Sequence, residues 1–131
     1  MLTLPRPKEK YAVLIAEPDE ECQGGFDYIF EPSEFDRIFV ESGPQAIETV
    51  LGRWVDLLIM DMEMGSMTGL EVIRVIHETA PAVPSILLGQ SFSKEARLEA
   101  MCDHVHACFP KPPNYPLMRR IALEILERHY S

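Results

Sequence analysis

The most informative stretch of this 131-residue sequence runs from Val55 to Leu70 and reads VDLLIMDMEMGSMTGL. Leu57 to Met60 are apolar at consecutive positions rather than at alternate ones, which is typical of a strand covered on both faces of a parallel sheet. The run leads directly into Asp61. We therefore predict a buried strand over Val55–Met60 that places the Asp61 carboxylate at one edge of a sheet.

Further elements follow from similar patterns on both sides of this stretch. Four more runs rich in aliphatic, aromatic or β-branched residues predict strands over Tyr11–Ala16, Arg37–Val40, Pro84–Leu88 and Ala107–Phe109. Between the strands, helices are predicted over Glu20–Phe30, Gln45–Trp54, Leu70–His77, Lys94–Met101 and Leu117–Tyr130. The first helix contains Gly24 and Gly25, which each cost about 1 kcal/mol relative to alanine within a helix.

The regular alternation of strands and helices predicts an α/β fold. Right-handed crossovers would give a doubly wound, five-stranded parallel sheet with helices on both faces and the flavodoxin-like strand order 2-1-3-4-5. A chain of this length forms about one domain. We expect a flexible N-terminal tail at residues 1–10 and a single domain at residues 11–131.

Charge and composition exclude several classes of function. Twelve Lys and Arg against 21 Asp and Glu give a formal net charge of -9, which repels nucleic-acid phosphates. The apolar runs are shorter than the roughly 20 residues that span a bilayer, and the N-terminus lacks the apolar core of a secretory signal. Three cysteines, an odd number, suit reduced thiols better than a disulfide framework. We expect a cytoplasmic protein that binds neither nucleic acid nor membrane.

Charged residues follow three of the predicted strands at the sheet edge where ligands bind in such folds. Glu17 and Asp19 follow the first strand, Asp61 ends the third, and Lys111 follows the fifth. Carboxylates placed together repel one another unless a cation lies between them, and Mg²⁺ prefers oxygen ligands. With a lysine to meet an anionic oxygen, this set suits phosphoryl transfer onto Asp61. Taken singly, each acid is better explained as a cap of the helix that follows it, and only their combination favours the phosphoryl-transfer site.

The same residues carry a family resemblance. The stretch Val55–Leu70 resembles the phosphoacceptor strand and loop of response-regulator receiver domains, Ser42-Gly43 with Ala46 is similar to a turn of that family, and Phe109-Pro110-Lys111-Pro112 is similar to its Lys-Pro motif. The resemblance implies that Asp61 accepts a phosphoryl group and that Lys111 contacts it. It also implies a Mg²⁺ site, for which this chain offers Glu17, Asp19, Asp61 and the backbone carbonyl of Glu63.

Several positions depart from the family pattern. Pro18 replaces the second acid after the first strand, Gly89 replaces a Ser or Thr that contacts the phosphoryl group, and Cys108 replaces an aromatic residue that usually couples to that hydroxyl. Ser91 is the nearby candidate for the missing hydroxyl. Gly65 stands where a proline is common.

The resemblance implies a receiver that takes a phosphoryl group from a histidine kinase or phosphotransfer protein. It would signal to a partner, or to a second copy in a homodimer, through the region Lys94 to Arg128. It would not be an enzyme beyond Mg²⁺-dependent self-phosphorylation and autodephosphorylation. A pseudo-receiver that serves as a protein-interaction module without phosphorylation is one alternative, and a flavin-binding or enzymatic flavodoxin-like domain is another.

Overall fold

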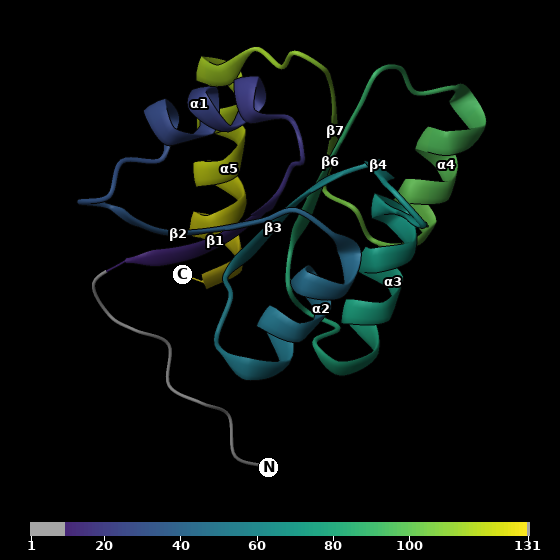
Figure 1. Cartoon of the computed structure of the whole chain (residues 1–131), viewed down its shortest axis with the longest axis horizontal. Helices are drawn as coiled ribbons and strands as arrows, with labels where there is room; N and C mark the ends of the chain where they lie inside the picture. Colours follow the sequence, from purple (N-terminus) through teal and green to yellow (C-terminus); the bar gives the residue numbers. More distant parts are fainter. Residues whose placement is uncertain (1–9, 131) are drawn as a thin grey trace.

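A computed structural model describes residues 10–130 of the chain and contains one central parallel sheet (Figure 1). Its strands are β1 (Tyr11–Ala16), β2 (Phe35–Val40), β3 (Leu57–Asp61), β6 (Ser85–Gly89) and β7 (Ala107–Pro110), in the order β2-β1-β3-β6-β7. Counting these five strands along the chain, the order is 2-1-3-4-5, so the predicted fold class and strand order are confirmed.

Five helices cover the two faces of the sheet. They are α1 (Glu20–Ile29), α2 (Gly43–Gly52), α3 (Gly69–Thr79), α4 (Lys94–Cys102) and α5 (Tyr115–Tyr130). Figure 1 shows α1 and α5 on one face and α2, α3 and α4 on the other. None of the helices within residues 10–130 is long and apolar enough to cross a membrane.

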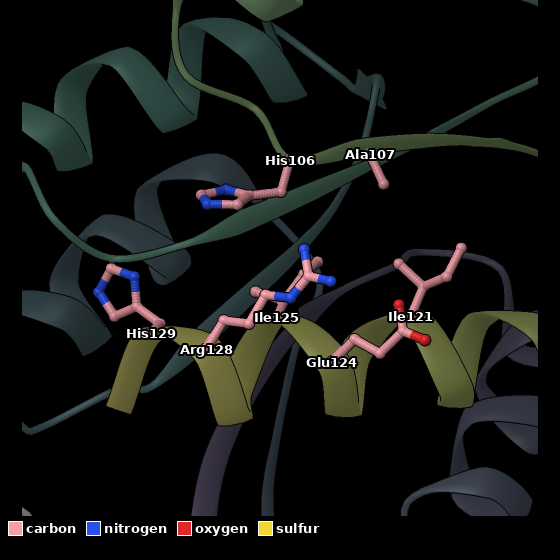
Figure 2. Close-up of a pocket in the computed structure, with 7 residues that line it drawn as sticks. All are labelled: His106, Ala107, Ile121, Glu124, Ile125, Arg128 and His129. Carbon is pink, nitrogen blue, oxygen red and sulfur yellow. The ribbon is translucent and has the colours of Figure 1, made fainter. Parts of the chain in front are cut away.

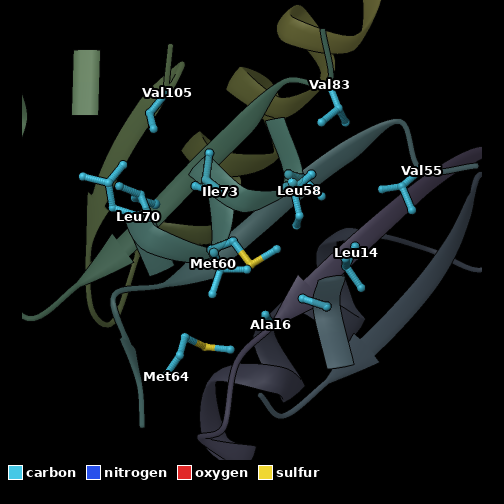
Figure 3. Packing of buried hydrophobic residues seen from close by; sticks show 14 of the residues in the cluster. Leu14, Ala16, Val55, Leu58, Met60, Met64, Leu70, Ile73, Val83 and Val105 are labelled. Carbon is cyan, nitrogen blue, oxygen red and sulfur yellow. The ribbon is translucent and has the colours of Figure 1, made fainter. Parts of the chain in front are cut away.

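The sheet separates two hydrophobic clusters because successive strand residues point to opposite faces. Leu14, Leu58 and Met60 pack with α2, α3 and α4, and Figure 3 shows them beside Leu70 and Ile73 of α3. Ile15 and Ile59, which alternate with them, pack with α1 and α5. Strands β1, β3 and β6 are therefore buried on both faces, as their continuous apolar runs predict.

The observed elements differ from the predicted ones at several boundaries. Strand β3 extends to Asp61 itself, and β2 begins at Phe35 rather than Arg37. Helix α2 begins at Gly43 because the Ser42 side chain accepts a hydrogen bond from the backbone N–H of Gln45 and so caps the helix before Pro44. The predicted tail at residues 1–10 lies outside the described residues except for Lys10, which is exposed.

A small hairpin, which the sequence did not predict, links β3 to α3. It pairs β4 (Glu63–Met64) with β5 (Met67–Thr68), and Gly65 takes a φ of 82° in its turn, a conformation that glycine adopts without steric cost. Gly69 follows, where an added Cβ would lie 2.3 Å from the Asp61 carbonyl oxygen. Glycine at this position lets α3 begin directly against the end of β3.

Candidate functional site

The candidate site lies at the carboxyl ends of the parallel strands. Glu17 follows β1, Asp61 is the last residue of β3, and Lys111 follows β7. Strands β1 and β3 are neighbours in register, with Ala16 opposite Met60. This pairing brings Glu17 and Asp61 to the same edge, and both carboxylates are almost completely buried, at 1% and 2% exposure.

The Lys111 ammonium bridges the two buried carboxylates. Its Nζ donates to Asp61 Oδ2 at 2.5 Å and lies 2.7 Å from Glu17 Oε1. The second oxygen of Asp61 accepts a hydrogen bond of 2.9 Å from the backbone N–H of Glu63. The contact with Glu17 is close but poorly directed, so both Glu17 oxygens lack a hydrogen bond of acceptable geometry. The contact between Glu17 and Lys111 therefore has the distance of an ion pair without the geometry of a directed hydrogen bond.

Local backbone contacts fix the position of Lys111. Its backbone N–H donates to the Gly89 carbonyl at 2.9 Å, which ties the end of β7 to the end of β6. The Lys111–Pro112 peptide bond is cis. The side chain is only 11% exposed, so the ammonium meets the carboxylates with little competition from water.

Burial and mutual contact shift the ionisation of all three groups. Burial, together with the neighbouring Asp61 carboxylate, raises the pKa of Glu17 to about 7 despite the opposing effect of Lys111. Burial alone would raise the pKa of Asp61, but the neighbouring Glu17 carboxyl, the Lys111 ammonium and the Glu63 N–H lower it below its usual value. Burial opposes the charge of Lys111, yet the two carboxylates raise its pKa. Asp61 is thus the ionised carboxylate of the pair.

Asp19 has a different environment from the other predicted ligands. It is exposed and caps α1, where its Oδ1 accepts a hydrogen bond of 3.0 Å from the backbone N–H of Glu21. Its Oδ2 lies 3.8 Å from the Cys22 thiol, which donates to it. The capping role considered from the sequence is therefore real for Asp19, whereas Glu17 and Asp61 face Lys111. Pro18, which lies between Glu17 and Asp19 in the sequence, is exposed and has no side-chain atom that could bind a metal.

The positions of the missing hydroxyl and aromatic ring are filled differently from the family pattern. Gly89 is buried at the end of β6, and a Cβ added there would lie 3.0 Å from Cζ of Phe92 and 3.6 Å from Cγ of Met62. Ser91 is exposed. Cys108 is half-buried against the cluster that also receives Phe92, and burial raises the pKa of its thiol. Phe92 therefore packs over the strand end where the sequence lacks a hydroxyl.

Two features of this edge were not found by sequence reasoning. The Gln23 side chain donates a hydrogen bond of 2.7 Å to the Glu17 carbonyl. The Arg97 guanidinium lies over the Phe92 ring, 5.7 Å from the ring centre. The small residues Gly89 and Cys108 were a signal that a large side chain could lie nearby. No pattern in the sequence indicated that Phe92 would be the one.

The buried carboxylates fit a hard divalent cation. Glu17 has two buried oxygens without a hydrogen bond, and Asp61 offers a second carboxylate at the same edge. Oxygen ligands of this kind suit Mg²⁺. Glu17, Asp61 and the Glu63 carbonyl are therefore chemically suitable ligands, and an Asp19 oxygen lies within 4.8 Å of a Glu17 oxygen.

A separate hollow of about 480 Å³ lies between β7 and α5 (Figure 2). Its walls combine apolar side chains with imidazole, guanidinium and carboxylate groups, and the lining residues are His106, Ala107, Ile121, Glu124, Ile125, Arg128 and His129. His106 precedes β7, so the hollow lies toward the amino ends of the strands and away from Asp61.

Comparison with known protein families gives a match over most of the chain. The model of the response regulator receiver domain matches residues 13–122. The regulatory protein LuxO of Vibrio cholerae is 33% identical over 70 residues, which are 53% of this chain and 15% of LuxO. The transcriptional regulatory protein ZraR of Escherichia coli O157:H7 is 35% identical over 60 residues, 46% of this chain and 14% of ZraR. The chain thus matches only a small part of the length of these relatives.

Solved structures show the same fold. The signal receiver domain of a putative LuxO repressor protein from Vibrio parahaemolyticus superimposes with a TM-score of 0.85 at 19% identity, covering 92% of each chain. A CheY-like receiver domain protein from Methanospirillum hungatei gives a TM-score of 0.84 at 18% identity, covering 91% of this chain and 95% of the other. At such low identity these likenesses concern the fold alone.

Proposed function

This chain belongs to the receiver-domain family of two-component response regulators, and on that premise we propose that it accepts a phosphoryl group on Asp61 and transmits the change to a partner protein. The observation that carries the proposal is the arrangement of Asp61 with Lys111 and Glu17 at the carboxyl ends of the strands. Receiver domains are signalling domains, and the enzymatic part of the proposal is limited to self-phosphorylation from a small donor and autodephosphorylation.

The ionised state of Asp61 supports its role as acceptor. Its lowered pKa keeps the carboxylate negative, so an oxygen is available to attack phosphorus. In transfer from a phosphohistidine, the new P–O bond forms on Asp61 as the donor P–N bond breaks, and the departing imidazole nitrogen takes up a proton. The charge that gathers on the phosphoryl oxygens needs a fixed cation nearby, which the Lys111 ammonium supplies.

Glu17, Asp61 and the backbone carbonyl of Glu63 would hold Mg²⁺, with Asp19 as a further carboxylate on the solvent side. A bound Mg²⁺ would neutralise charge on the transferring phosphoryl group. Glu17 contributes by its buried and incompletely hydrogen-bonded oxygens. Lys111 would then exchange its contact with Glu17 for one with the phosphoryl oxygens.

A pseudo-receiver remains the second candidate, and the packing at Gly89 favours it. The Phe92 ring lies against Gly89 at the place where a hydroxyl would contact the phosphoryl group, and Ser91 is exposed. Under this alternative, the Lys111 ion pairs stabilise the fold and the domain binds its partner without phosphorylation. Retention of a lowered Asp61 pKa beside Lys111 favours the phosphorylated receiver instead.

The partners would be a histidine kinase or phosphotransfer protein as donor and a protein target at the region Lys94 to Arg128. On this region, Leu98 and Met101 are exposed on the same side of α4, at 52% and 68%. The hollow beside His106 lies on the same region. A second copy of the chain is the alternative occupant, which would make the domain a homodimer.

The proposal is tested by the mass of the intact protein after incubation with acetyl phosphate, with and without Mg²⁺. We expect one Mg²⁺-dependent phosphoryl adduct in the natural protein and none in Asp61→Asn. Asp36→Asn, which changes an exposed carboxylate on β2, is the matched control and should retain the adduct. If neither acetyl phosphate nor a panel of histidine kinases phosphorylates the protein, the pseudo-receiver becomes the better description.

A further inference from the structure

Three potential metal ligands meet where β1 passes into α1. A Glu17 oxygen, an Asp19 oxygen and the Cys22 sulfur all lie within 4.8 Å of one another. Glu17 directly follows β1, Asp19 caps α1, and Cys22 lies in the first turn of α1 on the side that faces the core. The local chain geometry therefore brings a thiol to a pair of carboxylates, a combination that nothing in the sequence pattern indicated.

The state of Glu17 is an independent sign that this place is built for a ligand. Its side chain is 1% exposed, and neither oxygen has a hydrogen bond of acceptable geometry. Buried polar atoms are normally satisfied, because leaving them unpaired is unfavourable. Lys111 offsets the charge of Glu17 at Oε1, and a Glu17 oxygen lies within 4.8 Å of the ligand atoms of Asp19 and Cys22.

The spacing of the other two ligand atoms fits a small tetrahedral ion. The Cys22 sulfur lies 3.8 Å from Asp19 Oδ2. Zinc bonds of about 2.3 Å to sulfur and about 2.0 Å to oxygen at a tetrahedral angle place these atoms about 3.5 Å apart. A shift of a few tenths of an ångström would therefore close the site. Asp19 is exposed, so an ion can reach the site from solvent.

Backbone contacts hold the three ligands in this arrangement. Gln23 donates to the Glu17 carbonyl at 2.7 Å, and the Tyr115 hydroxyl donates to the Cys22 carbonyl at 3.2 Å. The Glu21 N–H holds the other Asp19 oxygen. These bonds fix the backbone at Glu17 and Cys22 and the orientation of the Asp19 carboxylate, which favours a preorganised metal site.

We propose that Glu17, Asp19 and Cys22 form a binding site for a thiophilic divalent cation such as Zn²⁺, with water in the fourth position. A sulfur ligand selects such an ion over Mg²⁺ or Ca²⁺. Binding replaces the thiol proton of Cys22, which is released to solvent, and draws Glu17 away from Lys111. The positive end of the α1 dipole opposes a cation, but three anionic ligands outweigh that partial charge. The site shares Glu17 and Asp19 with the proposed Mg²⁺ ligands, so the two ions would compete for them, and Cys22 is the ligand that distinguishes the two sites.

The test is titration of the reduced, full-length protein with Co²⁺ and Zn²⁺ alone, without a phosphodonor. Co²⁺ should produce a thiolate-to-metal charge-transfer band in the near ultraviolet, and Zn²⁺ should abolish it by competition. Cys22→Ser should lose the band, whereas Cys102→Ser and Cys108→Ser, which change the other two cysteines, should retain it. Calorimetry should show that Cys22→Ser binds Zn²⁺ at least about tenfold more weakly than the natural protein. Tenfold is the smallest loss usually seen when a residue that only supports a metal ligand is removed, and loss of a ligand itself should cost at least as much.

A second variant separates metal binding from folding. Asn is as good a helix cap as Asp, so Asp19→Asn should keep α1 while weakening Zn²⁺ binding. Circular dichroism and thermal unfolding confirm that each variant is folded before its titration is interpreted. A band that survives in Cys22→Ser, or the absence of any thiolate band in the natural protein at excess Co²⁺, would overturn the proposal. Neither result depends on whether Asp61 is phosphorylated, so the two proposals fail separately.

Discussion

At the scale of single residues, the main feature is a lysine and two acids that lie together at the sheet edge, largely shielded from solvent. Lys111 contacts two carboxylates that are 1% and 2% exposed. Removing one partner of a buried ion pair usually costs about 3–5 kcal/mol because the other charge is left unpaired. Here Glu17 can respond by holding a proton, since burial and the neighbouring Asp61 raise its pKa to about 7. Because Glu17 can be neutral, the two acids and the single lysine can be buried together without an unpaired negative charge.

Glu17 should make folding stability depend on pH. Its pKa in the folded protein is about 7, against 4.5 for the ordinary carboxyl, so within that window the folded state holds a proton that the unfolded chain has released. Stability should then fall as the pH rises through the window. In Glu17→Gln this dependence should weaken by on the order of 1–3 kcal/mol. The measurement is urea unfolding of both proteins at several pH values, with a chelator present.

Comparing the two proteins isolates Glu17 from other titrating groups. Burial lowers the pKa of His106, which makes stability fall as the pH drops below the ordinary histidine value. That effect is the same in both proteins and cancels in their difference. Parallel curves for the natural protein and Glu17→Gln would show that folding does not raise the pKa of Glu17.

The sequence predicted part of this site for sound physical reasons. Glu17, Asp61 and Lys111 follow apolar strand runs, and the strand order brings those ends together. Whether the Asp19 side chain points to the sheet edge or caps α1 depends on a side-chain torsion. The spacing of residues in the sequence could not predict that it caps α1. The Phe92 packing against Gly89 depends on the path of the loop after β6, which no periodicity encodes.

At the scale of elements, α1 shows why local propensity alone gave an incomplete picture. Gly24 and Gly25 both weaken a helix, yet α1 spans both. A Cβ added to Gly25 would lie 2.1 Å from Cζ of Tyr115, whereas one added to Gly24 would meet nothing within 4 Å. Gly25 therefore makes room for an aromatic ring of α5, and only a tertiary contact explains its presence.

The two glycines should respond oppositely to substitution by alanine. Gly24→Ala should stabilise the protein by about 0.5–1 kcal/mol through better helix propensity. Gly25→Ala should destabilise it by about 1–3 kcal/mol through overpacking, because the Tyr115 ring is held edge-on against Phe26 and by its hydroxyl. Urea unfolding of the two variants measures both changes. A shift of the same sign in both would mean that the ring moves aside freely.

The hairpin β4–β5 is the element that periodicity missed. Each of its strands has two residues, too few to show an alternation, and its turn depends on the positive φ of Gly65. The five longer strands could be predicted because each has four or more residues and packs against helices. The length of an element therefore decided whether its pattern was visible.

At the scale of the whole molecule, one sheet serves two hydrophobic clusters. Leu14 belongs to the cluster covered by α2, α3 and α4, and its neighbour Ile15 belongs to the cluster covered by α1 and α5. The same strands β1, β3 and β6 contribute to both. Loss of packing on one face therefore weakens the sheet on which the other face depends, and we expect the domain to unfold as one unit.

Alanine at either face should lower stability without splitting the transition. Leu14→Ala and Ile15→Ala each remove a side chain that is 0% exposed and should cost about 2–5 kcal/mol. Leu51→Ala, at a side chain 65% exposed, is the matched control and should change stability by less than about 0.5 kcal/mol. Unfolding followed by the fluorescence of Trp54, the single tryptophan, should coincide with unfolding followed by far-ultraviolet circular dichroism in every variant. If Ile15→Ala separated the two curves, the face formed by α1 and α5 would be an independent unit, and a signal at Asp61 could loosen one face while the other stayed folded.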